Sequence, residues 1–327
     1  MEKSVIIRKA NASDVEEFVK LYNEVWPDVT YDKRAKAEFI LSKSQGINYC
    51  AEKDGEIVGS RLSSTVNFRI GNRTLRCIQV GDTCTREDCR GQGILTRMNK
   101  SLLHDFFDVE KGEIIWNVSS DQARRVYEKL GWVYIQSFAG LVQVTRPLHI
   151  ISKIGYHISQ LFGQVNWDLK DDIKIVDSTL LKKREVLLAE SDLFHVCYDE
   201  STFKWRLSSH SGIKVFSDPS YGSIVYKVGE RNGLLYVLIG EIFLYEYSLK
   251  CFKHLLRKFQ DEVRPDVIKA SVSLGHPLRK FYKKCMFINN PKRRYFNHGV
   301  RISVTDNNKT AYEPDKWAIS MLDIDTF

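Results

Sequence analysis

The chain has few of the features that mark secreted, metal-bound or membrane-spanning proteins. Its 327 residues contain seven cysteines, an odd number, and no two are spaced as Cys-x-x-Cys. This favours reduced thiols in a cytoplasmic protein over a disulfide framework or a zinc site. No apolar run approaches the roughly 20 residues of a membrane span, and the N-terminal segment does not have the pattern of a secretory leader. We therefore expect no membrane span and no metal ion.

The chain is long enough for two domains, each with its own hydrophobic core. Its net charge of +8 is unevenly placed, because residues 148–327 hold 27 Lys and Arg against 21 Asp and Glu. Three short basic clusters indicate either solvated surface or a surface for an anionic substrate. No nucleic-acid-binding signature accompanies them, so we expect no nucleic-acid partner. The clusters are Lys182-Lys183-Arg184, Lys283-Lys284 and Lys292-Arg293-Arg294.

The segment Cys89 to Leu95, with the sequence Cys-Arg-Gly-Gln-Gly-Ile-Leu, is the most informative in the chain. A strand pattern precedes it, and a helical pattern from Ile94 to about Val109 follows. Glycines permit positive φ, and the loop amides and the helix dipole attract a phosphate. The segment predicts a site for a phosphorylated cofactor. No P-loop lysine and no Gly-x-Gly-x-x-Gly after a strand is present, which argues against a nucleotide triphosphatase or a dinucleotide enzyme.

Hydrophobic periodicity predicts alternating strands and helices along the first half. Residues 148–167 then predict an interdomain helix; a helix lying on a membrane surface is the alternative, but it has little basic flank. The second half shows a similar order of elements and ends in a predicted strand at 317–322. In the first half, strands are expected at about 5–8, 75–85, 114–118 and 133–145, helices at 13–22, 32–42, 94–109 and 121–130, and a hairpin at 48–70.

This order resembles the GNAT superfamily of acyl-CoA-dependent N-acetyltransferases over about residues 3–146, and two motifs carry the resemblance. The first is the pyrophosphate loop [Q/R]-x-x-G-x-[G/A], matched by Arg90 and Gly93, with Leu95 in place of the final small residue. The second is N-x-x-A-x-x-x-Y-x-x-x-G-[F/W], with Ser120 where Asn is usual. It is matched by Ala123, Tyr127, Gly131 and Trp132. The resemblance implies an α/β (α+β) fold, with a mixed central sheet flanked by helices.

The resemblance also implies acetyl-CoA as the cofactor and assigns site residues. The strand end from Val80 to Thr85 would bind the pantetheine arm, and the amides from Arg90 to Leu95 would bind the pyrophosphate. The cofactor-binding residues that it implies are Val80, Thr83, Cys84, Thr85, Arg90, Gly91, Gln92, Gly93, Ile94, Leu95 and Ser120.

Two residues are candidates for the chemistry. The resemblance implies that Tyr127 donates a proton to the leaving CoA thiolate. The pKa of a phenol is well matched to that of a thiol. The alternative is that Tyr127 is one more apolar position of its helix. Asp82 is the best-placed carboxylate for a general base, with a cap on a bulge or turn, or deprotonation through water, as alternatives. Cys84 and Cys89 flank the loop without an obvious His partner. His104 is expected to face solvent.

An internal repeat is predicted, because Tyr127 aligns with Tyr282 and Trp132 with Phe287 at a constant offset of 155. The second copy has no glycine loop, and Met286 stands where the first has Gly131. We therefore expect a GNAT acetyltransferase domain at 1–147, a linker helix at 148–170 and a degenerate GNAT-like domain without a cofactor site at 171–327.

The predicted function is transfer of an acetyl group from acetyl-CoA to a primary amine of a small molecule or an amino sugar, at one site per chain. Aromatic residues and the positive charge of the second half would suit an anionic or sugar acceptor. Alternatives are a protein-lysine or antibiotic acetyltransferase, or a non-catalytic acyl-CoA sensor. A further alternative, a tandem GNAT enzyme that uses aminoacyl-tRNA, would not need a pyrophosphate loop, so the intact segment from Arg90 to Leu95 argues against it. A homodimer is left open.

Overall fold

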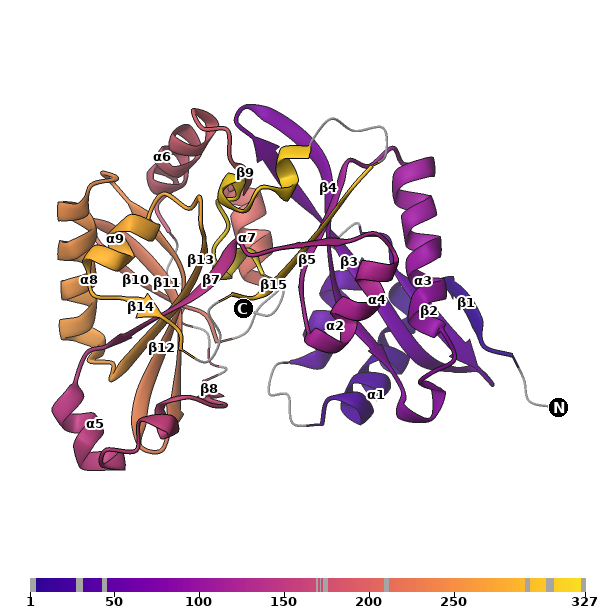
Figure 1. Cartoon of the computed structure of the whole chain (residues 1–327), viewed down its shortest axis with the longest axis horizontal. Coiled ribbons are helices and arrows are strands. Elements are labelled where there is room, and N and C mark those ends of the chain that lie inside the picture. The colour runs from indigo at the N-terminus through magenta and orange to yellow at the C-terminus, as the bar shows by residue number, and fades with distance from the viewer. Residues whose placement is uncertain are drawn as a thin grey trace. The chain divides into compact units, whose positions relative to one another are not determined.

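A computed structural model describes residues 4–27, 32–42, 46–168, 170, 172, 176–208, 212–291, 295–303 and 309–324. The chain folds into two compact units, each with a mixed sheet and helices, so the predicted fold class is confirmed (Figure 1). The first unit consists of Met1–Phe68, Thr74–Ile135 and Asn297–Tyr312. The second consists of Arg69–Arg73, Gln136–Phe296 and Glu313–Phe327.

The sheet of the first unit runs in the order β1-β2-β3-β4-β5-β15-β6. Its elements agree with the strands and helices predicted over residues 5–135. The strands are β1 (Ile6–Lys9), β2 (Tyr49–Lys53), β3 (Glu56–Ile70), β4 (Arg73–Thr85), β5 (Ile114–Ser119), β6 (Val133–Ile135) and β15 (Asn297–Ile302). The helices are α1 (Val15–Val25), α2 (Lys33–Ser42), α3 (Ile94–Leu103), which continues as a π-helical segment to Val109, and α4 (Asp121–Lys129).

The sheet of the second unit runs in the order β10-β11-β12-β13-β7-β14, with β8 beside β11. The strands of this sheet are β7 (Phe138–Val144), β8 (Asn166–Trp167), β10 (Lys214–Asp218), β11 (Gly222–Arg231), β12 (Leu234–Leu244), β13 (Val267–Ser273) and β14 (Ile288–Asn289). A further short strand, β9 (Phe194–Val196), is not part of this sheet. The helices are α5 (Pro147–Ile154), α6 (Ser178–Ala189), α7 (Glu200–Ser208), α8 (Leu249–Val263) and α9 (Arg279–Lys284).

Each sheet is completed by the last strand of the other repeat. In the first repeat β5, α4 and β6 follow one another, and β15 lies between the two strands, with Val300 opposite both Trp116 and Val133. In the second repeat β13, α9 and β14 follow one another, and β7 lies between them, with Leu141 opposite both Ala270 and Asn289. The compact units therefore divide the chain differently from the domains drawn at 147 and 171.

Two elements predicted in the second half are wrong. The helix expected over 148–167 ends at Ile154, because Gly155 takes φ +60° and leaves the helical region. The strand expected at 317–322 forms only isolated bridges through Trp317 and Ser320. Ser320 instead caps a short 3₁₀ turn, Met321–Asp323.

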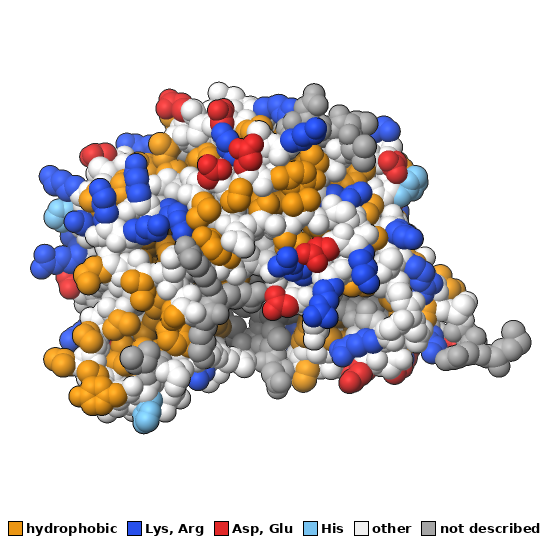
Figure 2. Space-filling view, viewed as in Figure 1, with side chains coloured by type: hydrophobic (Ala, Val, Ile, Leu, Met, Phe, Trp, Pro, Cys, Tyr) orange, Lys and Arg blue, Asp and Glu red, His pale blue; other side chains and the backbone are white. Residues whose placement is uncertain are grey.

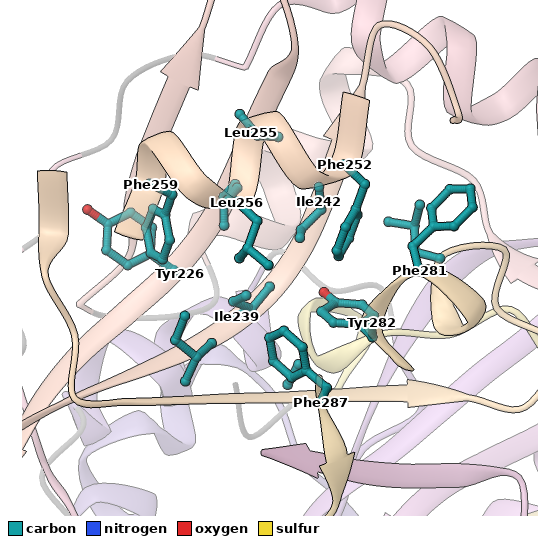
Figure 3. Close-up of a cluster of buried hydrophobic side chains, with 14 of the residues drawn as sticks. Tyr226, Ile239, Ile242, Phe252, Leu255, Leu256, Phe259, Phe281, Tyr282 and Phe287 are labelled. Atoms are coloured by element: carbon teal, nitrogen blue, oxygen red, sulfur yellow. The ribbon is translucent and has the colours of Figure 1, made fainter. Parts of the chain in front are cut away.

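The tyrosine of the second repeat that aligns with Tyr127 is part of a hydrophobic core. Tyr282 is 1% exposed and lies among Phe252 and Phe287, with ring centroids 5.1 and 4.9 Å away (Figure 3). Burial raises the pKa of Tyr282 well above its ordinary value. The side chains of α8, α9 and β12 thus fill this region.

One predicted basic cluster is only partly at the surface. Lys182 and Lys183 are exposed, but Arg184 is buried, and its guanidinium lies 3.5 Å from the carboxylate of Glu241. His276 Nε2 lies 3.3 Å from the same carboxylate. Burial raises the pKa of Glu241, but His276 and Arg184 outweigh it, so the pKa lies below its usual value. Arg184 is thus a core residue; Lys292, Arg293 and Arg294 lie outside the described residues.

Two buried histidines predict acid sensitivity. Burial lowers the pKa of His195 to about 4 and that of His298 to about 3. Between these values and an ordinary 6.5, the unfolded chain binds protons that the folded chain does not, so stability falls as pH falls. We expect each group to remove about 2 kcal/mol from the free energy of unfolding between pH 7 and pH 5.

Urea unfolding of wild type and His298→Gln at pH 7, 6 and 5 measures this dependence. The variant is expected to lose less stability over the same range. An identical pH dependence of the two proteins would contradict the assignment.

Candidate active site

The loop before α3 leaves a row of backbone amides open. Gly91 and Gly93 have φ +78° and +69°, and a Cβ at either position would meet nothing within 4 Å. These glycines are therefore needed for their backbone conformation and not for space. Among the described residues, the amides of 91–96 donate no hydrogen bond. Open amides at the positive end of a helix dipole are suited to an anion, so the loop stays the predicted pyrophosphate site.

Side chains around this loop leave its outer face accessible. The residues from Arg90 to Gly93 are exposed, Leu95 is half-buried and Ile94 is buried. The Arg90 side chain turns back, and its Nε donates to the Thr85 carbonyl at 3.2 Å. The predicted pyrophosphate loop thus lies directly beside the predicted pantetheine strand.

β4 and β5 are paired for only a short distance. Their parallel ladder runs from Cys77 opposite Ile114 to Gln79 opposite Trp116, while β4 continues to Thr85. Beyond Gln79, at Asp82, β4 takes φ +42°, which distorts the strand. Ser60 Oγ on β3 holds the distortion, because it donates to the Asp82 carbonyl and accepts from the Cys84 amide. The end of β4 is therefore separated from β5, as expected for the strand that would bind pantetheine.

The fold brings Tyr127 to the end of β4. Ser120 caps α4, with its side chain accepting from the Ala123 amide, and Tyr127 lies two turns along the helix. The Tyr127 hydroxyl lies 3.3 Å from Thr83 Oγ1, and its ring centroid lies 5.2 Å from that of Trp132. Tyr127 is thus 2% exposed, yet its polar end faces a predicted cofactor-binding residue. The cofactor role of Ser120 stays a prediction.

A fully buried arginine that the sequence analysis missed connects these parts. Arg61 on β3 donates from Nε to Asn99 Oδ1 at 2.7 Å and from Nη1 to Thr83 Oγ1 at 3.1 Å. Asn99 Nδ2 in turn donates to the Leu95 carbonyl at 2.9 Å. The guanidinium lies 5.5 Å from the Tyr127 ring centroid. Arg61 therefore joins β3, the end of β4 and the first turns of α3. The sequence signal that could have identified Arg61 is an arginine within a strand pattern that is otherwise apolar and buried.

A family model described as an acetyltransferase (GNAT) domain matches residues 6–135. These residues are similar to that family, and we refer to them below as the GNAT domain. No curated protein matches the chain.

Solved structures with low identity show that the fold extends beyond the GNAT domain. A GCN5-related N-acetyltransferase from Anabaena variabilis superposes with a TM-score of 0.65 at 10% identity, covering 91% of this chain and 73% of that one. A GCN5-related N-acetyltransferase from Kribbella flavida gives 0.61 at 10% identity, over 91% and 72%. Eis1 from Mycobacterium abscessus gives 0.56 at 14%, over 91% and 73%. The fold of these structures thus spans both units.

In the GNAT domain, the candidate base is held in an ion pair. Asp82 Oδ1 lies 2.9 Å from Lys36 Nζ on α2, and the two side chains are 6% and 10% exposed. The structure therefore shows Asp82 both at the strand distortion and in contact with a cation. Its role as a base stays a prediction.

Removing one member of this pair is expected to destabilise the GNAT domain. Asp82→Asn leaves the Lys36 charge buried without its carboxylate, which costs about 3 kcal/mol. The double variant Lys36→Met/Asp82→Asn is expected to recover at least half of that loss. Chemical denaturation measures the free energy of unfolding of the single and the double variant. Equal stability of Asp82→Asn and wild type would contradict a stabilising role of the ion pair.

The two cysteines beside the loop are poor nucleophiles. Burial raises the pKa of Cys84 to about 12 and also raises that of Cys89. Both thiols are therefore protonated at neutral pH, which disfavours transfer through an acyl-cysteine. His104 is exposed, as expected, and its Nδ1 contacts Asp108 at 3.0 Å.

Proposed function

We propose that the chain transfers an acetyl group from acetyl-CoA to a primary amine of a small molecule or an amino sugar. The observation that carries the proposal is the open row of amides at 91–96, positioned beside the end of β4 that faces the Tyr127 hydroxyl. The family match to an acetyltransferase domain and the neighbours described as N-acetyltransferases support it.

In the proposed reaction, the amide row binds the CoA pyrophosphate and the strand from Val80 to Thr85 binds the pantetheine arm. The amine nitrogen forms a bond to the acetyl carbon, and the bond between that carbon and the CoA sulfur breaks. Tyr127 donates its proton to the sulfur, while the new amide nitrogen loses a proton to Asp82 or to water. The products are the acetylated amine and CoA with a free thiol.

The proposal is tested first by titration calorimetry with acetyl-CoA and then by thiol release with a panel of small amines, amino sugars and lysine peptides. We expect acetyl-CoA binding and thiol release with one class of amine. Binding without turnover on any amine would favour the acyl-CoA sensor, and turnover with lysine peptides alone would favour a protein acetyltransferase. Absence of binding would overturn the cofactor site.

A glycine variant tests whether binding depends on the loop. Gly93→Ala places a Cβ on a residue at φ +69° and is expected to weaken acetyl-CoA binding at least tenfold as the amides rotate away. Gly55→Ala, in the turn between β2 and β3, is the matched control. It carries a comparable φ of +87° and also has open space for a Cβ. Equal effects of the two variants on binding would contradict a specific role of the loop.

A further inference from the structure

The second unit exposes aliphatic side chains around β14. Met286 is 82% exposed, Ile288 64% and Leu148 81%, although such side chains are normally covered. Ile288 lies opposite Val142 in the β14–β7 ladder, so exposed Val144, two residues further along β7, is on the same face. We call Val144, Leu148, Met286 and Ile288 the apolar rim.

Six basic side chains lie beside the apolar rim. Lys250, Lys253 and Arg257 are exposed on α8 at spacings of three and four residues, and so share one side of the helix. α9 packs on α8, with the Phe252 ring 5.8 Å from that of Phe281. It carries the exposed residues Lys280, Lys283 and Lys284. We call these six residues the basic face.

The basic face and the apolar rim are contiguous. Met286 follows α9 by two residues and leads into β14. Lys253 is next in sequence to Phe252, whose ring packs on that of Phe281 in α9. Figure 2 shows Lys and Arg side chains gathered over α8 and α9, above a group of hydrophobic side chains over β14 and α5.

On α8 the exposed Asp261 lies one turn beyond Arg257, whereas α9 and the residues around it carry no acidic side chain. Residues 267–305 contain nine Lys and Arg and no Asp or Glu. Among the residues that the structure describes, none of the six basic-face residues forms an ion pair within 4 Å. Their charge is therefore available to an anionic partner.

We propose that the basic face and the apolar rim together bind the surface of an anionic phospholipid bilayer. Lysine and arginine side chains would meet the headgroup phosphates, while the aliphatic side chains would enter the boundary between headgroups and acyl chains. A nucleic acid would use the positive charge but not the aliphatic side chains. A two-fold dimer through this face would bring the same lysines together, which like-charge repulsion opposes.

The test is co-sedimentation of the full chain with vesicles of phosphatidylcholine alone or with 30% phosphatidylglycerol, at low salt and at about 0.5 M salt. We expect binding to the anionic vesicles only, and its loss at high salt. Lys283→Glu/Lys284→Glu is expected to lower the affinity at least tenfold, and Met286→Ser/Ile288→Ser at least threefold. Lys182→Glu/Lys204→Glu, the matched control on α6 and α7, is expected to bind as wild type does.

Several results would overturn the proposal. They are equal binding to both vesicles, binding to neither, or equal effects of the basic-face pair and the control pair. Light scattering that shows a dimer broken by Met286→Ser/Ile288→Ser would assign the face to a second copy. Binding of a short RNA that is insensitive to the apolar substitutions, without vesicle binding, would assign it to nucleic acid. Because vesicle binding requires no acetyl transfer, the test is independent of the proposed function.

Discussion

Tyr127→Phe is expected to lower kcat at least 100-fold while acetyl-CoA affinity stays within about twofold of wild type. The substitution removes only the hydroxyl that lies 3.3 Å from Thr83 Oγ1, and the ring keeps its packing against Trp132. Without a positioned proton donor, the CoA sulfur must leave as a thiolate or take its proton from water. Thiol release under saturating acetyl-CoA and titration calorimetry measure the two quantities separately.

The second repeat supplies the matched control. Tyr282→Phe removes a hydroxyl from the equivalent helix position, where the ring lies in the hydrophobic core. We expect kcat unchanged and a loss of stability of no more than about 1.5 kcal/mol. Unchanged turnover in Tyr127→Phe, or equal loss of turnover in both variants, would show that Tyr127 does not act as the proton donor.

The parts of the site that the sequence predicted are local in the chain. Positive φ at Gly91 and Gly93 and the helix that starts at Ile94 follow from the backbone freedom of glycine and from hydrophobic periodicity. The spacing from Ser120 to Gly131 likewise lies within one helix and its ends. Such features depend on neighbours a few residues away, so a single sequence carries them.

The parts that the sequence did not predict depend on contacts between distant segments. Lys36 and Asp82 are 46 positions apart, and neither residue indicates the other. The sequence also did not show that β15 lies in the sheet of the first repeat and β7 in that of the second. The buried-strand pattern of each strand fits either sheet. The exposed basic and apolar residues of the second unit were visible in the sequence, but which of them share a face depends on α8, α9 and β14 packing together.

Arg61→Met is expected to affect both the stability of the GNAT domain and its proposed cofactor site. The substitution keeps an apolar stem of similar length but leaves Asn99 Oδ1 and Thr83 Oγ1 without their guanidinium partner. Unpaired buried polar groups cost about 1–3 kcal/mol each, so we expect a loss of about 3 kcal/mol in the free energy of unfolding. Because Asn99 also holds the Leu95 carbonyl, acetyl-CoA affinity is expected to fall at least fivefold.

Arg184→Met separates the two effects. Arg184 is also buried, but it contacts Glu185 and Glu241 in the second unit. We expect a comparable loss of stability with acetyl-CoA affinity unchanged. Arg61→Lys should recover little, because an ammonium cannot reach Asn99 and Thr83 together with the geometry of a guanidinium. Chemical denaturation measures the stability of the three variants, and titration calorimetry measures their acetyl-CoA affinity. Equal affinities in Arg61→Met and Arg184→Met would reduce Arg61 to a purely structural residue.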